Sequence, residues 1–357
     1  MRICYVANSA SVHTEKWAKY FSDLGHDVHI ISHCPNKISG VKVHYINYNL
    51  RNFIFMKRKV HNLINIIDPD VVHAHQANTC GFYATTQKKY KVILSAWGSD
   101  ILVNPNKSVV LKKMVKYIIK NAYFITSDSK FMSSKIIELG GNKDRIYTFP
   151  MGLEDSILPY KRKIKHNEYI KIISTRRLES IYNIDVLIKG FYKALMKNSN
   201  LQLIIAADGS EFNNLKDMVR SLNIDNNVEF IGRYKGEEVG KLLEKNDIFI
   251  SIPSSDSTSV SLLEAMYCGL FPIVSDLPAN KEWIQNKENG IIIKNINSEE
   301  VCNSILWCVN NLEVVNNALF TNRDIIKKHA LWKDNSKIVE NLYNKIIKLK
   351  NKKFVRN

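Results

Sequence analysis

The chain has 357 residues, of which 45% are hydrophobic and 24% are charged. At roughly 150 residues per domain, this length predicts two domains, and the composition excludes a disordered or collagen-like chain. No apolar run reaches the roughly 18 residues that a membrane-spanning helix needs, and the first residues are typical of a strand rather than a signal peptide. We therefore expect a cytoplasmic protein whose six cysteines, which lack a CxxC spacing, are buried thiols rather than disulfides or zinc ligands.

The positive charge is concentrated in the first half of the sequence. The formal net charge is +17, and residues 1–170 carry 25 basic and 12 acidic side chains, against 26 and 22 in residues 171–357. This asymmetry indicates either an anionic partner, such as a membrane surface, or the lysine-rich composition of an AT-rich genome. Both interpretations stay open. Because the sequence shows no recognisable nucleic-acid-binding module, we do not expect a nucleic acid as partner.

In chain order, strand-like and helix-like segments alternate from the first residues. Short apolar runs rich in β-branched and aromatic residues predict strands, and apolar residues at helical spacing predict helices. The predicted strands are 3–7, 28–32, 71–74, 92–96, 123–127 and 146–149, and the predicted helices are 13–24, 109–119 and 130–139. These segments form a predicted first domain at residues 1–157.

The alternation restarts after an aperiodic basic stretch, which we interpret as a linker at residues 158–168. Predicted strands at 170–174, 201–206, 228–231, 248–252, 272–275 and 291–293 belong to a second domain at 169–334, and a closing helix with a basic tail occupies 335–357. Alternation of this kind predicts an α/β protein of two doubly wound domains that face each other across a cleft. In such sheets, ligands lie beyond the carboxyl ends of the strands.

Several common catalytic motifs are absent. The sequence has no GxGxxG after a strand, no GxxxxGK[ST], no HExxH and no GxSxG. Asp68 and Asp70 form a DxD that a metal diphosphate site would use, but Pro69 and the apolar residues that follow favour a turn entering a strand. We therefore predict no metal site.

The informative stretch is residues 248–266, where a buried strand enters a polar loop and then a helix. Ser257 or Thr258 is a candidate helix cap, and the free N–H groups of a helix start favour a phosphate. An ionised Glu264 on so apolar a helix is costly unless something binds it. If the helix includes Asp256, the carboxylates of Asp256 and Glu264 lie about 80° apart around the helix axis and roughly 12 Å apart along it. This separation suits one carboxylate at a sugar and the other at a ribose, with a diphosphate between them. The alternative is that Asp256 is only a cap and that Glu264 pairs with a lysine.

An ordered series of motifs spans nearly the whole chain. It comprises the segments 70–75, 150–152, 208–209 and 228–232, the pair Asp256-x7-Glu264, the segment 269–275, Glu282, Gly290 and Trp332. This series resembles the family-4 retaining glycosyltransferases of the GT-B fold, which has two Rossmann-like domains. The resemblance implies transfer of a hexosyl or N-acetylhexosaminyl group from a nucleoside diphosphate sugar, here UDP-linked, with retained anomeric configuration. It also implies a glycan or lipid-linked acceptor in cell-surface polysaccharide synthesis, with no metal or other cofactor.

The resemblance also implies roles for donor-side residues. Glu264 is expected to bind the ribose hydroxyls and Asp256 the transferred sugar. The main-chain amides of three further residues are expected to meet the sugar or the phosphates, namely Thr258, Ser259 and Val260. Arg177 falls on the family's diphosphate arginine, whereas Tyr182 falls on its usual lysine, so Arg176 is expected to supply the second cation. Gly209 follows the strand that ends near residue 206, and we expect it beside the donor.

On the other domain, the resemblance points to a strand end at residues 95–100. Trp97 stands where many relatives have a histidine, so Asp100 is the expected acceptor of the proton from the attacking hydroxyl; its other possible role is to cap the next segment. Ser11, His13 and His75 are expected to line the cleft, as is Tyr182 of the second domain. A lone histidine is more often a surface, capping or core group, and that alternative stays open.

Two stretches, 51–59 and 111–120, mix apolar and basic residues. They are either helices that lie on an anionic membrane interface, on the inner face of the cell membrane, or ordinary amphipathic helices packed on the sheet. Two further hypotheses for function compete with sugar transfer. One is a nucleotide-sugar 2-epimerase of the same architecture, and the other is a non-catalytic protein that binds an anionic surface.

Overall fold

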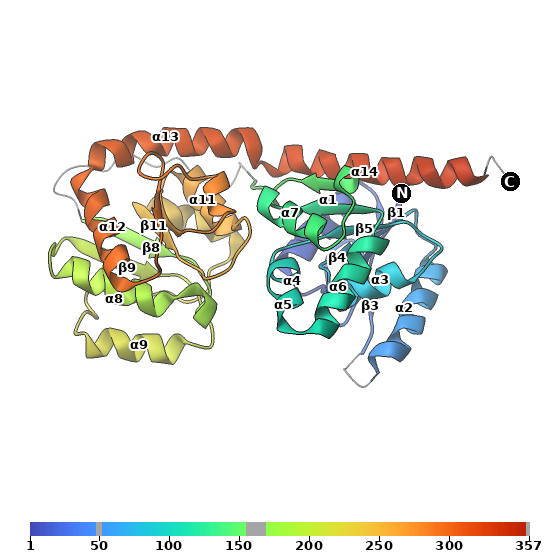
Figure 1. Ribbon diagram of the computed structural model, residues 1–357, viewed down its shortest axis with the longest axis horizontal. Coiled ribbons are helices and arrows are strands. Elements are labelled where there is room, and N and C mark those ends of the chain that lie inside the picture. The colour runs from blue at the N-terminus through green and yellow to red at the C-terminus, as the bar shows by residue number, and fades with distance from the viewer. Residues whose placement is uncertain (48–51, 155–168, 355–357) are drawn as a thin grey trace. The chain divides into compact units, whose positions relative to one another are not determined.

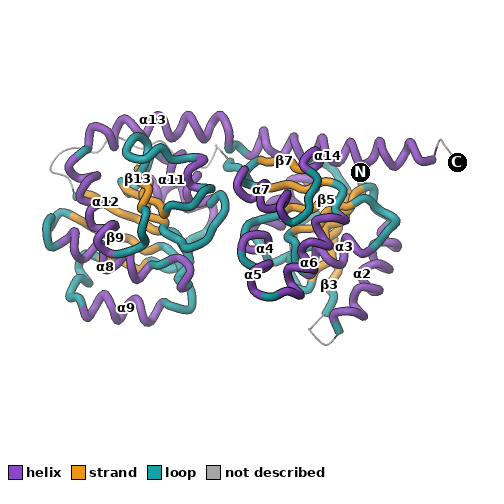
Figure 2. The backbone as a smooth tube through the Cα atoms, viewed as in Figure 1, coloured by secondary structure: helices purple, strands orange, loops and turns teal. Residues whose placement is uncertain are grey.

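The computed structural model describes residues 1–47, 52–154 and 169–354, which fall into two compact units. Unit 1 comprises Met1–Phe149 and Ser336–Asn357, and unit 2 comprises Pro150–Asn335. Each unit holds one parallel sheet with helices packed against it (Figures 1 and 2). The predicted α/β class with two doubly wound sheets is confirmed. The predicted linker at 158–168 lies wholly within residues 155–168, outside the described part of the chain.

Unit 1 contains a seven-stranded sheet in the order β3-β2-β1-β4-β5-β6-β7, in which all neighbours are parallel. Its strands are β1 Arg2–Val6, β2 Asp27–Ser32, β3 Val41–Tyr45, β4 Val71–His75, β5 Val92–Ser95, β6 Phe124–Ser127 and β7 Ile146–Thr148. Its helices are α1 Val12–Asp23, α2 Phe53–Ile67, α3 Thr79–Thr86, α4 Ser99–Leu102, α5 Asn104–Lys107, α6 Val109–Asn121 and α7 Lys130–Glu138. The strand order reverses between β1 and β4, which makes this the crevice where ligands of such sheets bind.

Helices cover both faces of the unit 1 sheet because the strands are apolar on both faces. On one face, α2, α3, α6 and α7 bury aliphatic side chains such as Ile64, Ile118 and Ile136 in one core with the strands. On the other face, Phe21 of α1 contacts the ring of Tyr343, which belongs to the last helix of the chain. That helix, α14 Trp332–Phe354, begins three residues before the closing helix and basic tail predicted at 335–357, and its residues from Ser336 onward belong to unit 1.

Unit 2 contains a six-stranded parallel sheet in the order β10-β9-β8-β11-β12-β13. Its strands are β8 Ile170–Ser174, β9 Leu201–Ile205, β10 Val228–Phe230, β11 Ile248–Ser251, β12 Phe271–Ser275 and β13 Ile291–Ile293. Its helices are α8 Ile184–Leu195, α9 Phe212–Ser221, α10 Val239–Glu244, α11 Val260–Cys268, α12 Ser298–Asn310 and α13 Leu312–His329. The order reverses between β8 and β11, so the candidate crevice of this unit lies beyond the ends of these two strands.

The sequence patterns missed strand β3 and helix α3 of unit 1, as well as the short helices α4 and α5. Strand β3 is an edge strand without a fully buried residue, so it lacks the apolar run that marks the inner strands. Helix α3 is buried nearly all round and therefore shows no amphipathic period. The Asp68-Pro69-Asp70 segment is a turn, as predicted, because Asp68 ends α2 and Asp70 accepts a hydrogen bond from the N–H of Arg2 at 2.8 Å.

The sequence analysis also made predictions about the cysteines and about membrane-spanning helices. Five of the six cysteines are buried, as predicted, and Cys34 is half-buried; all six are free thiols. Among the described residues, none of the helices combines the length and the apolar character that crossing a membrane requires.

Candidate active site

The candidate site of unit 2 lies at the carboxyl edge of its sheet, where the strand order reverses. The loop after β8 carries Arg176, and the loop after β11 carries Asp256 and leads into α11. Because β8 and β11 are parallel neighbours, both loops leave the sheet at the same edge. The donor residues predicted from separate parts of the sequence are therefore brought together by the fold.

Arg176 joins the two loops across this crevice. Its Nη2 donates to Asp256 Oδ2 at 2.7 Å, and its Nη1 donates to the hydroxyls of Ser259 and of Ser261, the latter at 3.1 Å. The guanidinium lies 4.4 Å from the ring centroid of Tyr182, and the Arg176 side chain is only 11% exposed. A cation over an aromatic face and a charge-assisted pair are both favourable, so Arg176 is held in one position.

Helix α11 begins later than the sequence pattern predicted. Its first residue is Val260 and its N-cap is Ser259, so the predicted cap at Ser257 or Thr258 is wrong. Asp256 therefore lies in the loop, and the angle and separation calculated for one continuous helix do not apply to it. The physical reason is that side-chain hydrogen bonds hold this stretch as a loop: Asp256 Oδ1 accepts the N–H of Ser257 at 2.9 Å, and the Ser259 hydroxyl bonds to Arg176. The predicted end of the helix is correct, since Gly269 adopts φ 82° there.

Glu264 lies half-buried on α11, on the side where Tyr234 follows β10. Burial, together with the charge of Glu264, raises the pKa of Tyr234 to about 12. Glu264 belongs to the second turn of α11, which follows the loop that carries Asp256, and the charge of Arg176 also acts on Tyr234. Tyr234 and Ser261 were not identified from the sequence. The Ser259-x-Ser261 spacing at the helix start is the one signal that would have found Ser261.

The main-chain groups predicted to meet the donor lie at the start of α11. Thr258 and Ser259 are buried, and Val260 is the first helical residue. The N–H groups of the first turn of an α-helix have no acceptor within the helix, and the helix dipole adds positive potential at this end. The Oγ of Ser174, at the end of β8, is buried without a hydrogen-bond partner among the described residues. The crevice thus offers donors suited to an anionic ligand.

Arg177 and Gly209 were also predicted to lie beside the donor, and the structure gives each of them surroundings that differ from those of Arg176. The Arg177 side chain is 66% exposed, and its Nη2 donates to Glu179 Oε1 at 3.3 Å. Gly209 lies against the main chain of Leu178, where an added Cβ would stand 2.4 Å from the carbonyl oxygen. Arg177 is therefore an accessible cation on the loop after β8, and Gly209 allows that loop to approach the one after β9.

Replacing Gly209 by Ala is expected to displace the loop after β8, because a Cβ at 2.4 Å from main-chain oxygen requires the main chain to move. Overpacking of this kind costs about 1–3 kcal/mol of the free energy of unfolding. Donor affinity measured by calorimetry should fall together with the melting temperature. Gly236→Ala is the matched control, because nothing lies within 4 Å of a Cβ at Gly236. Equal behaviour of the two variants would contradict the close approach.

Unit 1 has its own cluster of rings at the carboxyl edge, where the strand order reverses. His75, the last residue of β4, lies 4.7 Å from Trp97, and Trp97 lies 5.4 Å from His13 of α1, measured between ring centroids. His75 Nδ1 is 3.1 Å from Thr14 Oγ1, and its Nε2 is buried without a hydrogen-bond partner among the described residues. Ser11 is the N-cap of α1 beside this cluster. The structure therefore brings these predicted unit 1 residues together.

Asp100 is buried in the same unit, with only 1% of its surface exposed. Its Oδ2 accepts from the N–H of Ala77 at 2.7 Å and its Oδ1 from the N–H of Trp97 at 3.1 Å. Burial raises the pKa of this carboxyl, while these N–H groups act in the opposite direction. In this position Asp100 ties the loops after β4 and β5 together, and it does not cap α4, whose N-cap is Gly98 and which has no side-chain cap hydrogen bond. Its role as proton acceptor stays a prediction.

A second buried histidine joins four strands to the last helix. His73 Nδ1 lies 2.7 Å from the Tyr343 hydroxyl, and His73 Nε2 lies 2.8 Å from Ser95 Oγ. The chain of hydrogen bonds continues from Ser95 to Thr126 at 2.7 Å and from Tyr343 to the Tyr5 hydroxyl at 3.0 Å. Burial lowers the pKa of His73 to about 3 and holds that of His75 well below its usual value.

Unit 1 is therefore expected to lose stability in mild acid. An unfolded histidine has a pKa near 6.5, so the folded state favours the neutral form, and stability is fully present above about pH 6.5 and falls as the pH drops toward 3. Each such histidine contributes a slope of up to about 1.4 kcal/mol per pH unit. Urea unfolding at pH 7.5, 6 and 5 measures this slope. His73→Gln should flatten it, whereas exchange of the exposed His329 should not, and a pH-independent midpoint in the parent protein would disprove the mechanism.

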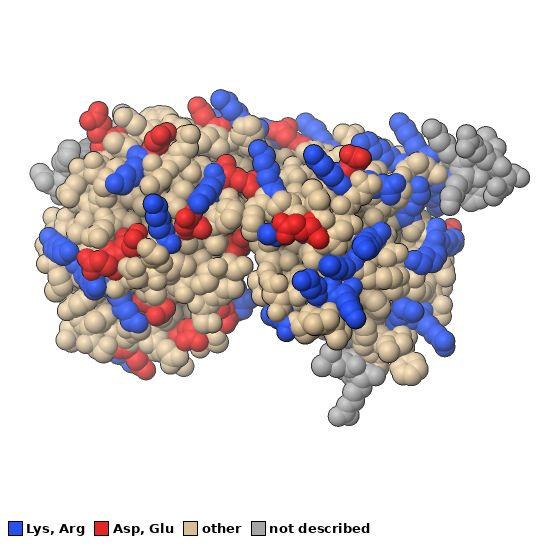
Figure 3. Space-filling model, in the orientation of Figure 1, with Lys and Arg blue, Asp and Glu red and all other residues tan. Residues whose placement is uncertain are grey.

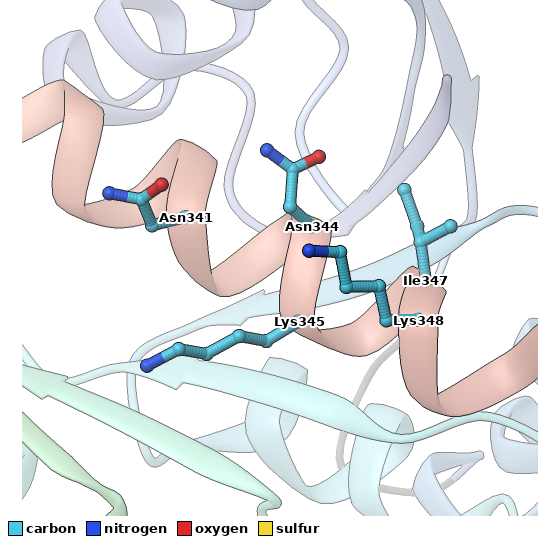
Figure 4. A pocket seen from close by; sticks show the side chains of 5 residues that line it. All are labelled: Asn341, Asn344, Lys345, Ile347 and Lys348. Carbon is cyan, nitrogen blue, oxygen red and sulfur yellow. The ribbon is translucent and has the colours of Figure 1, made fainter. Parts of the chain in front are cut away.

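A surface hollow follows α14, lined by Asn341, Asn344, Lys345, Ile347 and Lys348 (Figure 4). All five residues come from this helix, and none is among the residues predicted for the site. Within residues 1–47, 52–154 and 169–354, no three His, Cys, Asp or Glu side chains are grouped so as to hold a metal ion. The chemistry therefore concentrates at the two sheet edges described above.

Comparison with known proteins agrees with this geometry. Residues 158–349 match the family model described as glycosyl transferases group 1, and residues 2–129 match the model described as glycosyl transferase 4-like. The N-acetyl-alpha-D-glucosaminyl L-malate synthase of Bacillus anthracis is 24% identical over 315 residues, which cover 81% of both chains. The alpha-monoglucosyldiacylglycerol synthase of Acholeplasma laidlawii is 24% identical over 371 residues, which cover 92% of both chains.

The fold also matches solved structures. The crystal structure of Anabaena HepE in complex with UDP and glucose superposes with a TM-score of 0.80 at 16% identity, and the match covers 96% of this chain and 100% of that one. At this identity the match establishes the fold, and the family model, which spans more than half of the chain, establishes the family. The chain belongs to the glycosyl transferases group 1 family, and it is a glycosyltransferase with the GT-B fold.

Proposed function

We propose that this glycosyltransferase moves a hexosyl or N-acetylhexosaminyl group from a UDP-sugar to a glycan or lipid-linked glycan, with retention of the anomeric configuration. The observation that carries the proposal is the position of Arg176. It spans the crevice between the loops after β8 and β11, in contact with Asp256 and with the serines at the start of α11. A fixed guanidinium beside a helix N-terminus suits a diphosphate, and a carboxylate beside both suits sugar hydroxyls.

Each group then has a separate task. Glu264 accepts hydrogen bonds from the ribose hydroxyls, and Asp256 accepts from the transferred sugar. Arg176, the exposed Arg177 and the first N–H groups of α11 hold the diphosphate, so the proposal needs no metal ion to meet its charge. The bond from the anomeric carbon to the diphosphate breaks, and the acceptor oxygen bonds to the same face of that carbon. Asp100, whose two oxygens each accept one N–H and keep a further lone pair, is the proposed acceptor of the hydroxyl proton.

The choice of UDP is supported by the complex of HepE with UDP and glucose. The choice of a lipid-linked acceptor is supported by the name of the Acholeplasma relative, which describes the synthesis of a glucosylated diacylglycerol. We accordingly propose that the activity belongs to cell-surface polysaccharide synthesis, on the inner face of the cell membrane. The experiment below tests these assignments on this chain.

The test is a thermal-shift screen of the folded protein against UDP-, GDP- and TDP-sugars, because a ligand that binds the native state raises the melting temperature. NMR of the mixture with a glycan or glycolipid acceptor then identifies the product and its anomeric configuration. A retained configuration with UDP release supports the proposal. Conversion of the donor into another nucleotide sugar without an acceptor would identify the epimerase instead. Absence of any donor shift would contradict the proposal.

A further inference from the structure

The surface of unit 1 that carries α2, α3 and α6 has an unusual charge. Between Val28 and Ser127 the sequence has fourteen Lys and Arg residues, but its acidic residues are only Asp68, Asp70 and Asp100. Asp100 is buried, and Asp68 is paired with Lys89 at 3.0 Å. Asp68 and Asp70 both precede β4, so they lie at the amino edge of the sheet. Helices α2 and α6 themselves contain Lys and Arg but no Asp or Glu, and α3 has no charged residue.

The three helices form one layer on the same face of the sheet (Figure 1). Rings join them: Phe53 of α2 lies 5.2 Å from Phe82 of α3, and Phe82 lies 6.0 Å from Tyr117 of α6, between centroids. Helices α2 and α6 each lead back to the amino end of the following strand. Both therefore run antiparallel to the strands, and both begin at the carboxyl edge of the sheet.

The first turns of α2 and α6 expose large apolar side chains. Ile54 and Phe55 are 72% and 70% exposed, and Val109 and Val110 are 69% and 76% exposed. The helices do not need these residues for packing, because other residues, such as Val60 and Ile64 of α2 and Val115 and Ile118 of α6, fill the core. An ordinary helix packed on a sheet turns a polar face to water, so these exposed apolar turns call for another explanation.

Cations follow directly after each apolar turn. The exposed cations are Arg58 and Lys59 on α2 and Lys112, Lys113 and Lys116 on α6. Among the described residues, none of the five takes part in an ion pair. On the face of unit 1 that Figure 3 draws, Lys and Arg side chains outnumber acidic ones. We call the four apolar and five cationic side chains together the docking face.

We propose that the docking face binds an anionic lipid surface, with the apolar turns of α2 and α6 entering the headgroup region and the five cations meeting the lipid phosphates. Apolar side chains beside clustered lysines are the combination that interfacial helices use, and apolar burial and charge attraction add together there. A nucleic acid would use the cations but would leave Ile54, Phe55, Val109 and Val110 in water. The surface lies at the edge where the acceptor is expected, so this inference rests on the proposed function and deepens it by assigning where its lipid-linked acceptor is met.

The test is sedimentation of the full chain with vesicles of phosphatidylcholine alone, or of phosphatidylcholine and phosphatidylglycerol in equal amounts. Binding is expected only to the anionic vesicles and should weaken as salt is raised. The triple variant Lys112→Glu, Lys113→Glu, Lys116→Glu and the double variant Ile54→Ser, Phe55→Ser should each reduce binding about tenfold or more. All altered side chains are exposed, so circular dichroism and melting temperature should be unchanged.

Matched controls use exposed residues of unit 2, namely Lys327→Glu with Lys328→Glu, and Met196→Ser, which should leave vesicle binding unchanged. Equal binding to neutral and anionic vesicles, or equal losses in the controls, would overturn the proposal. The proposal would also be overturned if duplex DNA displaced the protein from the vesicles and if the Ile54→Ser, Phe55→Ser variant still bound that DNA. UDP-sugar binding is measured on the same preparations. Donor binding without vesicle binding refutes only the docking face, and the reverse refutes only the proposed function.

Discussion

Replacing Glu264 by Gln is expected to weaken UDP binding roughly 30- to 150-fold, which corresponds to about 2–3 kcal/mol. The side chain keeps its size, so the fold of α11 should persist. In the proposed function, the substitution removes the charged acceptor of the ribose hydroxyls, and hydrogen bonds to an ionised group are the strong ones. Isothermal calorimetry with UDP, which lacks the sugar, isolates this contact from those made by Asp256.

Glu313→Gln is the control for this experiment, because Glu313 is an exposed glutamate in the first turn of another helix of unit 2, α13. It should bind UDP as the parent does. If Glu264→Gln also binds UDP with the parent affinity and an unchanged melting temperature, then Glu264 is not part of the nucleotide site. The position of this carboxylate near Tyr234 would then serve only the packing of α11.

Replacing Asp256 by Asn is expected to lower the rate of sugar transfer without lowering the affinity for UDP. If the proposed function is correct, sugar transfer should fall about 100-fold or more, because Asp256 would accept from the transferred sugar and its charge would stabilise the positive charge that develops on that sugar. Affinity for UDP should be unchanged or higher. The reason is that Asp256 pairs with Arg176 at 2.7 Å in the structure, so a diphosphate competes with this carboxylate for the same guanidinium.

Transfer rates under saturating donor and calorimetry with UDP measure the two effects separately. Asp185→Asn is the matched control, since Asp185 is a half-exposed carboxylate of unit 2 that pairs with Lys189 one helical turn away. An Asp256→Asn variant that loses UDP affinity in parallel with activity would contradict the competition between Asp256 and the diphosphate. In that case the ion pair with Arg176 would be a structural support that the bound state retains.

Local sequence patterns predicted those strands and helices whose burial produces a regular pattern of apolar residues. The strands β1, β2, β4 and β5 were predicted because an inner parallel strand is apolar on both faces. Strand β3 escaped because an edge strand buries less, and α3 escaped because a helix buried all round has no polar face. The end of α11 at Gly269 was predictable because only glycine adopts φ 82° without strain.

The amino-acid sequence by itself determined the fold class and the identity of the charged residues, because alternating apolar periods and the ordered motif series are local properties of the chain. Only the tertiary structure decided which arginine lies in the crevice. Arg176 and Arg177 are adjacent and chemically identical, but successive residues of a loop project in different directions, and the parallel pairing of β8 and β11 brings Asp256 and Tyr182 to Arg176 alone. The same holds for Asp100, whose buried carboxylate accepts two main-chain N–H groups from separate loops that no spacing in the sequence reveals.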